Sequence, residues 1–151
     1  MEQSEQPQSN FVIQKIYTKD ISFESPSSPG AFKLNWNPQA NVELNMKNKT
    51  LDNDIYELDL IVTVNTKNQN ENTFVIEVNQ SGIFTISDIP EDQMGHMLGS
   101  FCPSILFPYA KETINGLVNK GGYPQINLTP INFDALYMQN LSQNQTSDTK
   151  H

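Results

Sequence analysis

Residues 54–66, DIYELDLIVTVNT, alternate between apolar and polar side chains along almost their whole length. One face carries Tyr56, Leu58, Leu60, Val62 and Val64, and the other carries Glu57, Asp59, Thr63 and Asn65. Alternation with a period of two is typical of a β-strand with one buried face and one face in water. Such strands pair into antiparallel sheets that are covered on a single side. This stretch therefore predicts an open-faced antiparallel sheet.

Three other segments, at residues 11–24, 41–47 and 73–84, show the same alternation. The odd positions of the first segment hold Phe11, Ile13, Tyr17, Ile21 and Phe23, and its even positions from Thr18 onward are polar. Lys15 and Lys19 interrupt the apolar face. The polar segment KNQNEN at 67–72 is short enough for a hairpin connection. We therefore predict a sheet of four strands.

The hydrophobic period lengthens to that of a helix after residue 87. Ser87 or Asp88 can cap the first helix, and Pro90 suits its first turn. Pro103 and Pro108 each predict a break or kink, and apolar stripes at helical spacing follow over residues 110–118 and 133–141. We expect one α+β domain over residues 11–141, with flexible polar tails at residues 1–10 and 142–151.

Two features of the connecting segments suggest close packing or binding. Gly95 and Gly99 are four residues apart, so they share a helix face that another element can approach closely; the alternative is a loose segment. The segment at residues 25–39 is a long loop with three prolines, and it carries Phe32, Leu34 and Trp36. These apolar side chains either anchor the loop on the core or are kept for a ligand.

The chain is acidic, with 17 acidic and 9 basic side chains and a formal net charge of −8. Nucleic acid is excluded as an expected partner, because phosphate contacts need clustered basic side chains. The acidic residues of the predicted strands fall on their polar faces: Asp20, Glu24, Glu57, Asp59 and Glu77. If these faces coincide, the sheet has an acidic surface with few lysines, suited to a basic partner. An ordinary solvated sheet face is the alternative.

Catalytic and metal-binding patterns are missing from the sequence. His96 and Cys102 are six residues apart and do not share a helix face, and Cys102 lies among apolar residues as a buried structural thiol would. Two histidines and one cysteine do not make a zinc site, and no phosphate-binding loop is present. We therefore expect no enzyme activity, no metal and no cofactor.

The sequence has no recognisable targeting or membrane segment. The N-terminal residues MEQSEQPQSN lack the apolar core of a signal peptide, and the longest apolar stretch is too short to cross a bilayer. The single cysteine rules out an internal disulfide. We expect a cytoplasmic protein without direct membrane insertion.

Four segments together resemble the SecB family of bacterial protein-export chaperones: IYTKDISFESP (16–26), GIFTI (82–86), GSFCPSILFPYAKETI (99–114) and GGYPQINLTPINFDALYM (121–138). The resemblance extends over residues 11–141. It implies a four-stranded antiparallel sheet with helices packed on one face, assembled as a homotetramer that is a dimer of dimers. It also implies an ATP-independent cytosolic chaperone that holds unfolded secretory precursors in a translocation-competent state and delivers them to the SecA motor.

The resemblance also carries functional positions onto this chain. It implies SecA binding at Asp20, Glu24, Val75 and Glu77. It implies a client-binding groove at Trp36, Val42, Leu44, Tyr137 and Leu141, and a subunit interface at Ile76, Val78 and Gln80. The alternative function on the same fold is that of a general holdase or a toxin–antitoxin-associated chaperone.

Overall fold

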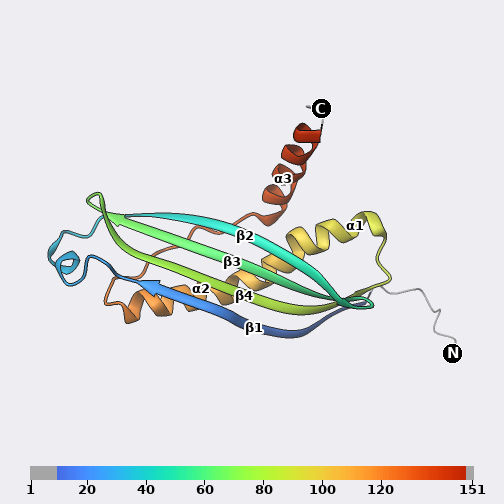
Figure 1. Ribbon diagram of the computed structural model, residues 1–151, viewed down its shortest axis with the longest axis horizontal. Helices are drawn as coiled ribbons and strands as arrows, with labels where there is room; N and C mark the ends of the chain where they lie inside the picture. Colours follow the sequence, from blue (N-terminus) through green and yellow to red (C-terminus); the bar gives the residue numbers. More distant parts are fainter. Residues whose placement is uncertain (1–9, 149–151) are drawn as a thin grey trace.

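The computed structural model describes residues 10–148, which form one four-stranded antiparallel sheet with helices on one side (Figure 1). The strands are β1 (Asn10–Glu24), β2 (Pro38–Asp52), β3 (Ile55–Asn68) and β4 (Glu71–Ser87), in the spatial order β1-β4-β3-β2. The predicted strands and the hairpin near residue 70 are confirmed. Strands β2, β3 and β4 are longer than predicted, because pairing continues to the tight turns that join them, and β1 begins one residue earlier than predicted.

The long helix α2 (Cys102–Lys120) crosses one face of the sheet and closes the core (Figure 1). The even-numbered residues of β3 and β4 point at α2, and many of them are fully buried: Leu58, Leu60, Val62, Val64, Phe74, Ile76, Val78, Phe84 and Ile86. Leu106, Ala110, Ile114 and Val118 repeat at helical spacing on the facing side of α2 and are also fully buried. The alternation seen in the sequence is therefore the boundary between core and open face.

Strand β1 corrects one prediction, because two β-bulges change which side chains face the core. The register shifts at Gln14 and again at Lys19, and each extra residue reverses the alternation. Between the bulges Thr18 therefore faces the α2 side, and Tyr17 lies on the open face, opposite to the prediction. The lysines that interrupted the apolar pattern of this segment are explained by the same shifts.

The helical segment differs from the prediction at its start and at Pro108, whereas the α-helical pattern is interrupted next to Pro103, as predicted. Helix α1 (Glu91–His96) begins after Pro90 rather than at Ser87 or Asp88. A π-helical turn, η2 (Met97–Phe101), joins α1 to α2, and the Cys102 amide donates to the Met97 carbonyl. Pro103 then lies in the first turn of α2, where its missing N–H costs little. Pro108 does not end the helix, which continues to Lys120.

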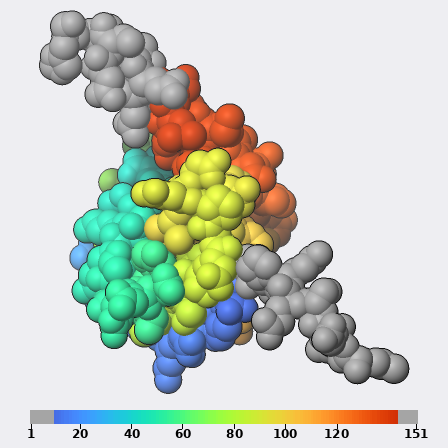
Figure 2. Space-filling model, turned by 90° about the vertical axis from the view of Figure 1, so that its right-hand side faces the viewer, coloured from blue at the N-terminus to red at the C-terminus, as the bar shows by residue number. Residues whose placement is uncertain are grey.

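The predicted role of the two glycines in close packing is confirmed. Helix α3 (Phe133–Asp148) docks by its first turns on α1 and η2, and Figure 2 shows α1 between α3 and the end of the β2–β3 hairpin. A Cβ atom built on Gly95 would lie 2.7 Å from the Tyr137 hydroxyl, and one on Gly99 would lie 2.6 Å from its ring. Only glycine leaves room for this ring.

The last helix is longer than predicted. We expected it to end near Leu141, but its backbone is helical to Asp148, so residues 142–148 are not an irregular tail. The predicted flexible segment at residues 1–10 lies outside the described residues except for Asn10, which begins β1, and residues 149–151 also lie outside them.

Replacing Gly82 by alanine is expected to destabilise the protein. A Cβ at this buried position would lie 2.7 Å from the Phe84 ring and 3.1 Å from Leu106, so the strand–helix contact must open. We expect the free energy of unfolding, measured in urea at fixed protein concentration, to fall by roughly 1–3 kcal/mol. Gly30→Ala is the control, because nothing lies within 4 Å of its Cβ position. The control should raise the free energy of unfolding by roughly 0.5–1 kcal/mol. Equal effects of the two changes would contradict the packing described.

Candidate functional site

The face of the sheet opposite α2 is open and carries the acidic side chains predicted there. Strand register puts Asp20 beside Asn79, Ser22 beside Glu77, and Glu24 beside Val75. Thr63 of β3 pairs with both Glu77 and Glu43, so these carboxylates share one row. The acidic faces of the strands therefore coincide. We call Asp20, Glu24, Glu43 and Glu77 the acidic patch; within residues 10–148 no basic side chain forms a salt bridge with any of them.

The expectation of little lysine on this face is wrong for Glu57 and Asp59. The Lys19 ammonium lies 3.0 Å from Glu57 Oε1 and 3.4 Å from Asp59 Oδ2, and Lys49 Nζ lies 3.7 Å from Glu57 Oε1. The second β1 bulge supplies Lys19, because the extra residue projects toward the open face. Strand register also puts Lys15 beside Ile83 and Lys47 beside Asp59 on this face, and we call Lys15, Lys19, Lys47 and Lys49 the lysine patch.

Hydrogen bonds hold Glu57 and Asp59 in place. The Tyr17 hydroxyl donates to Glu57 Oε2, and the Ser81 hydroxyl donates to Asp59 Oδ1 over 2.6 Å. The bonds from Tyr17 and Lys19 lower the pKa of Glu57. Burial, and then the bond to Glu57, raise the pKa of Tyr17 to about 12. The bond to Glu57 also raises the pKa of Lys19. Glu57 is therefore a fixed, paired anion.

An apolar groove of about 320 Å³ lies beside the edge strand β2, on the same side of the sheet as α2. Val42 and Leu44 line it from the strand, and Phe107, Leu128 and Ile131 line it from α2 and the segment that follows. The groove thus contains two of the five predicted client-binding residues. The lining residues that follow α2 were not predicted. The sequence does carry a signal for this segment, because apolar Ile126 and Leu128 alternate with polar residues, and both are buried in the structure.

The other three predicted client-binding residues lie elsewhere. Trp36 stacks on Tyr123 with ring centroids 5.6 Å apart, so the aromatic side chain anchors its loop on the core. Tyr137 packs on Gly95 and Gly99, with its ring edge toward the His96 ring. Leu141 is 39% exposed on α3. None of these three lines the groove beside β2.

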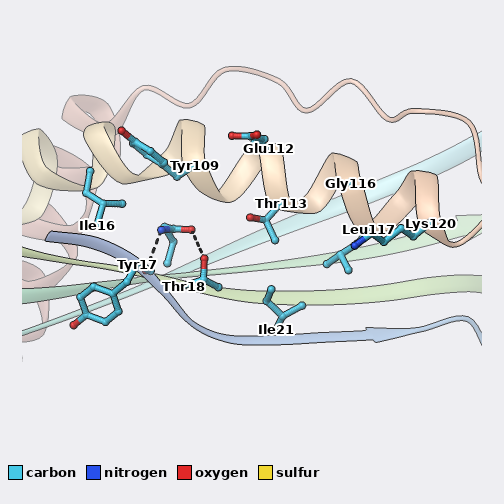
Figure 3. A pocket seen from close by; sticks show the side chains of 11 residues that line it. Ile16, Tyr17, Thr18, Ile21, Tyr109, Glu112, Thr113, Gly116, Leu117 and Lys120 are labelled. Carbon is cyan, nitrogen blue, oxygen red and sulfur yellow. Dashed lines mark hydrogen bonds between the residues drawn. The ribbon is translucent and has the colours of Figure 1, made fainter.

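A second groove, of about 550 Å³, separates β1 from α2 (Figure 3). Ile16 and Ile21 line it from the strand, and Tyr109 and Gly116 line it from the helix. Gln80 lies at its floor, where it donates to the Tyr17 carbonyl and accepts from the Thr18 hydroxyl. Ile76 and Val78, predicted with Gln80 at a subunit interface, are fully buried beneath α2 within the single chain.

His96 and Cys102 take structural positions. His96 Nε2 lies 2.7 Å from Asp134 Oδ1, and the Ser100 hydroxyl donates to the same oxygen, which lowers the pKa of Asp134. Cys102 is fully buried, and burial raises the pKa of its thiol to about 12. Within residues 10–148 there is no cluster of three metal-ligating side chains and no helix long and apolar enough to cross a membrane.

The described residues thus form a sheet with one face covered by α2, a charged open face, and an apolar groove beside β2. A family model described as preprotein translocase subunit SecB matches residues 3–144. The protein-export protein SecB of Methylococcus capsulatus is 49% identical over 144 residues, which cover 95% of this chain and 93% of that protein. The chain belongs to the SecB family of protein-export chaperones, which are not enzymes.

A solved structure shows the same fold at much lower sequence identity. The SecB-like chaperone Rv1957 of Mycobacterium tuberculosis, in complex with a ChAD peptide from the antitoxin HigA1, superposes with a TM-score of 0.67. It is 12% identical, and the match covers 80% of this chain and 90% of that one. The sheet-and-helix architecture is therefore shared where the sequence is not.

A pH titration should detect the partly buried Tyr17 hydroxyl. Its pKa of about 12 lies above the ordinary 10.0, so its contribution to stability is complete below pH 10 and is lost as the pH rises through 12. Phenolate absorbance should show a step near pH 12 that is missing in Tyr17→Phe. Glu57→Gln, which removes the neighbouring charge, should move this step to lower pH. A step unaffected by Glu57→Gln would contradict the hydrogen bond described.

Proposed function

We propose that this chaperone uses its two faces for different partners: the open face binds SecA, and the helix side binds unfolded secretory precursors. The observation that carries this proposal is the separation of the acidic patch from the apolar groove beside β2. Side chains of Glu43 and Leu44, adjacent in β2, point to opposite faces, so a partner on one face leaves the other free. A precursor can then stay bound while the complex is delivered in the cytoplasm.

The acidic patch supports SecA binding at Asp20, Glu24, Val75 and Glu77. Glu24 pairs directly with Val75, and Ser22 separates Asp20 from Glu24 beside Glu77, so the four positions form one continuous area. The acidic side chains make no salt bridge within residues 10–148 and are available to a basic segment of the motor. Such complementarity speeds encounter and selects the partner. Val75 adds an apolar contact beside Glu24.

The groove beside β2 supports binding of unfolded chains. Its apolar lining suits any segment rich in apolar side chains, because hydrophobic burial has no directional requirement. Val42 and Leu44 form its wall, and the edge of β2 has no strand beyond it in the sheet, so an extended client can add backbone hydrogen bonds. Trp36, Tyr137 and Leu141 extend the proposed client surface beyond this groove. No ATP is needed for binding of this kind.

The groove between β1 and α2 supports the proposed homotetramer, a dimer of dimers. Ile21 is 46% exposed and Tyr109 is 47% exposed beside this groove, so a second copy can bury apolar surface there. Gln80 lines the groove directly, whereas Ile76 and Val78 support it from beneath. A toxin–antitoxin-associated role is the alternative, and recovery of a toxin–antitoxin pair without SecA would favour it.

Asp20→Lys is expected to weaken SecA binding by about tenfold or more at low salt, because it places a like charge against a basic partner. Isothermal titration with SecA measures the change, and suppression of precursor aggregation should stay at the wild-type level. Glu91→Lys makes the same charge change on α1 and should leave both readouts unchanged. Equal loss of SecA binding and client holding in Asp20→Lys would reject separate faces.

Leu44→Glu is expected to impair client holding, since it puts a charge into the apolar groove. Light scattering of a denatured secretory precursor, diluted without ATP, measures the loss. Asn45→Glu introduces the same charge on the opposite face and should keep client holding. Circular dichroism of both variants checks folding. If folded Leu44→Glu protects the precursor as well as wild type, this groove is not the client site.

A further inference from the structure

The open face carries two patches of opposite character, at different distances along the strands. The acidic patch occupies the rows of Asp20, Glu24 and Glu77, and the lysine patch occupies the rows of Asp59 and Glu57. Strand β2 contributes to both patches, with Glu43 in the first and Lys47 and Lys49 in the second. These positions are four and six residues apart, which is about 13 and 20 Å along an extended strand.

The lysine patch retains positive charge after its own ion pairs are made. Its four lysines face two carboxylates, Glu57 and Asp59, and Asp52 lies one row beyond Lys49 opposite Ile55, so the lysines and these three carboxylates together carry a net charge of +1. Lys19 is engaged by both carboxylates, and Lys49 lies 3.7 Å from one of them. Lys47 makes no salt bridge within residues 10–148 and lines a hollow of about 240 Å³ beside Lys49.

The two patches act on different parts of a bound partner. Screening reduces interactions between exposed charges beyond about 8 Å at physiological salt, which is shorter than the distance of about 13 Å from Glu43 to Lys47 along β2, although Lys19 and Asp20 are neighbours on β1. The acidic patch therefore does not cancel the field at Lys47 and Lys49. A purely basic segment that extended from the acidic patch along β2 would be repelled by these lysines, whereas a segment that turned acidic would be attracted.

We propose that the partner of the open face binds in one direction, with a basic segment on the acidic patch and an acidic segment, four to six residues further along an extended stretch, on the lysine patch. This inference rests on the proposed docking of SecA at the acidic patch. The lysine patch makes the binding site bipolar, so it selects a charge order as well as a charge. Lys19 supports this division, because it forms ion pairs with the two carboxylates that would otherwise extend the acidic patch.

Synthetic peptides test the charge order directly. One peptide carries a lysine run, a neutral spacer of about five residues and an aspartate run; a matched peptide has asparagine in place of aspartate. We expect wild-type protein to bind the first about fivefold more tightly, as measured by fluorescence anisotropy. Lys47→Glu should remove this preference and leave the asparagine peptide bound at least as well. Lys33→Glu, the same charge change on a distant loop, should keep the preference.

The outcomes separate this inference from the docking that it rests on. Equal binding of the two peptides by wild-type protein, with both lost in Asp20→Lys, overturns the bipolar site and leaves the acidic patch as the docking surface. If wild-type protein binds neither peptide, both proposals fail.

Discussion

The burial of one face of β3 and β4 beneath α2 fixes the rest of the structure. Each fully buried aliphatic side chain, such as Leu60 or Val62, stabilises the fold by about 1.5–3 kcal/mol. A slip of one residue in either strand would turn these side chains to water and bring carboxylates such as Asp59 into the core. Register is therefore strongly specified, and the charges on the open face are held in register by a core that they do not contact.

The same alternation explains how well the central strands could be predicted. In a strand with one buried face and one face in water, apolar and polar residues alternate along the sequence, as they do in residues 54–66. Strand β1 lies at the sheet edge, where Ile13 and Ile21 remain 44% and 46% exposed, and its bulges reverse the pattern twice. Lys15 and Lys19 were visible irregularities, but nothing in the sequence said that an extra residue caused them.

Other features depend on contacts between distant segments, which periodicity does not encode. The pairing of Lys19 with Glu57 joins residues 38 positions apart, and it requires both a bulge and the β1-β4-β3 strand order. The apolar groove likewise combines β2 with a segment beyond α2. Pro108 lies within a continuous helix, because the packing of Leu106 and Ala110 on the sheet outweighs a local preference for interruption.

The buried thiol has a practical consequence for work on this chaperone. Cys102 is the only cysteine in the chain, and it is enclosed by α2 and the sheet with almost no thiolate at neutral pH. Maleimide and disulfide reagents need an exposed thiolate, so we expect that they do not react with Cys102 in the folded protein. A single cysteine introduced on either face would therefore accept a fluorophore or spin label without removal of the natural one.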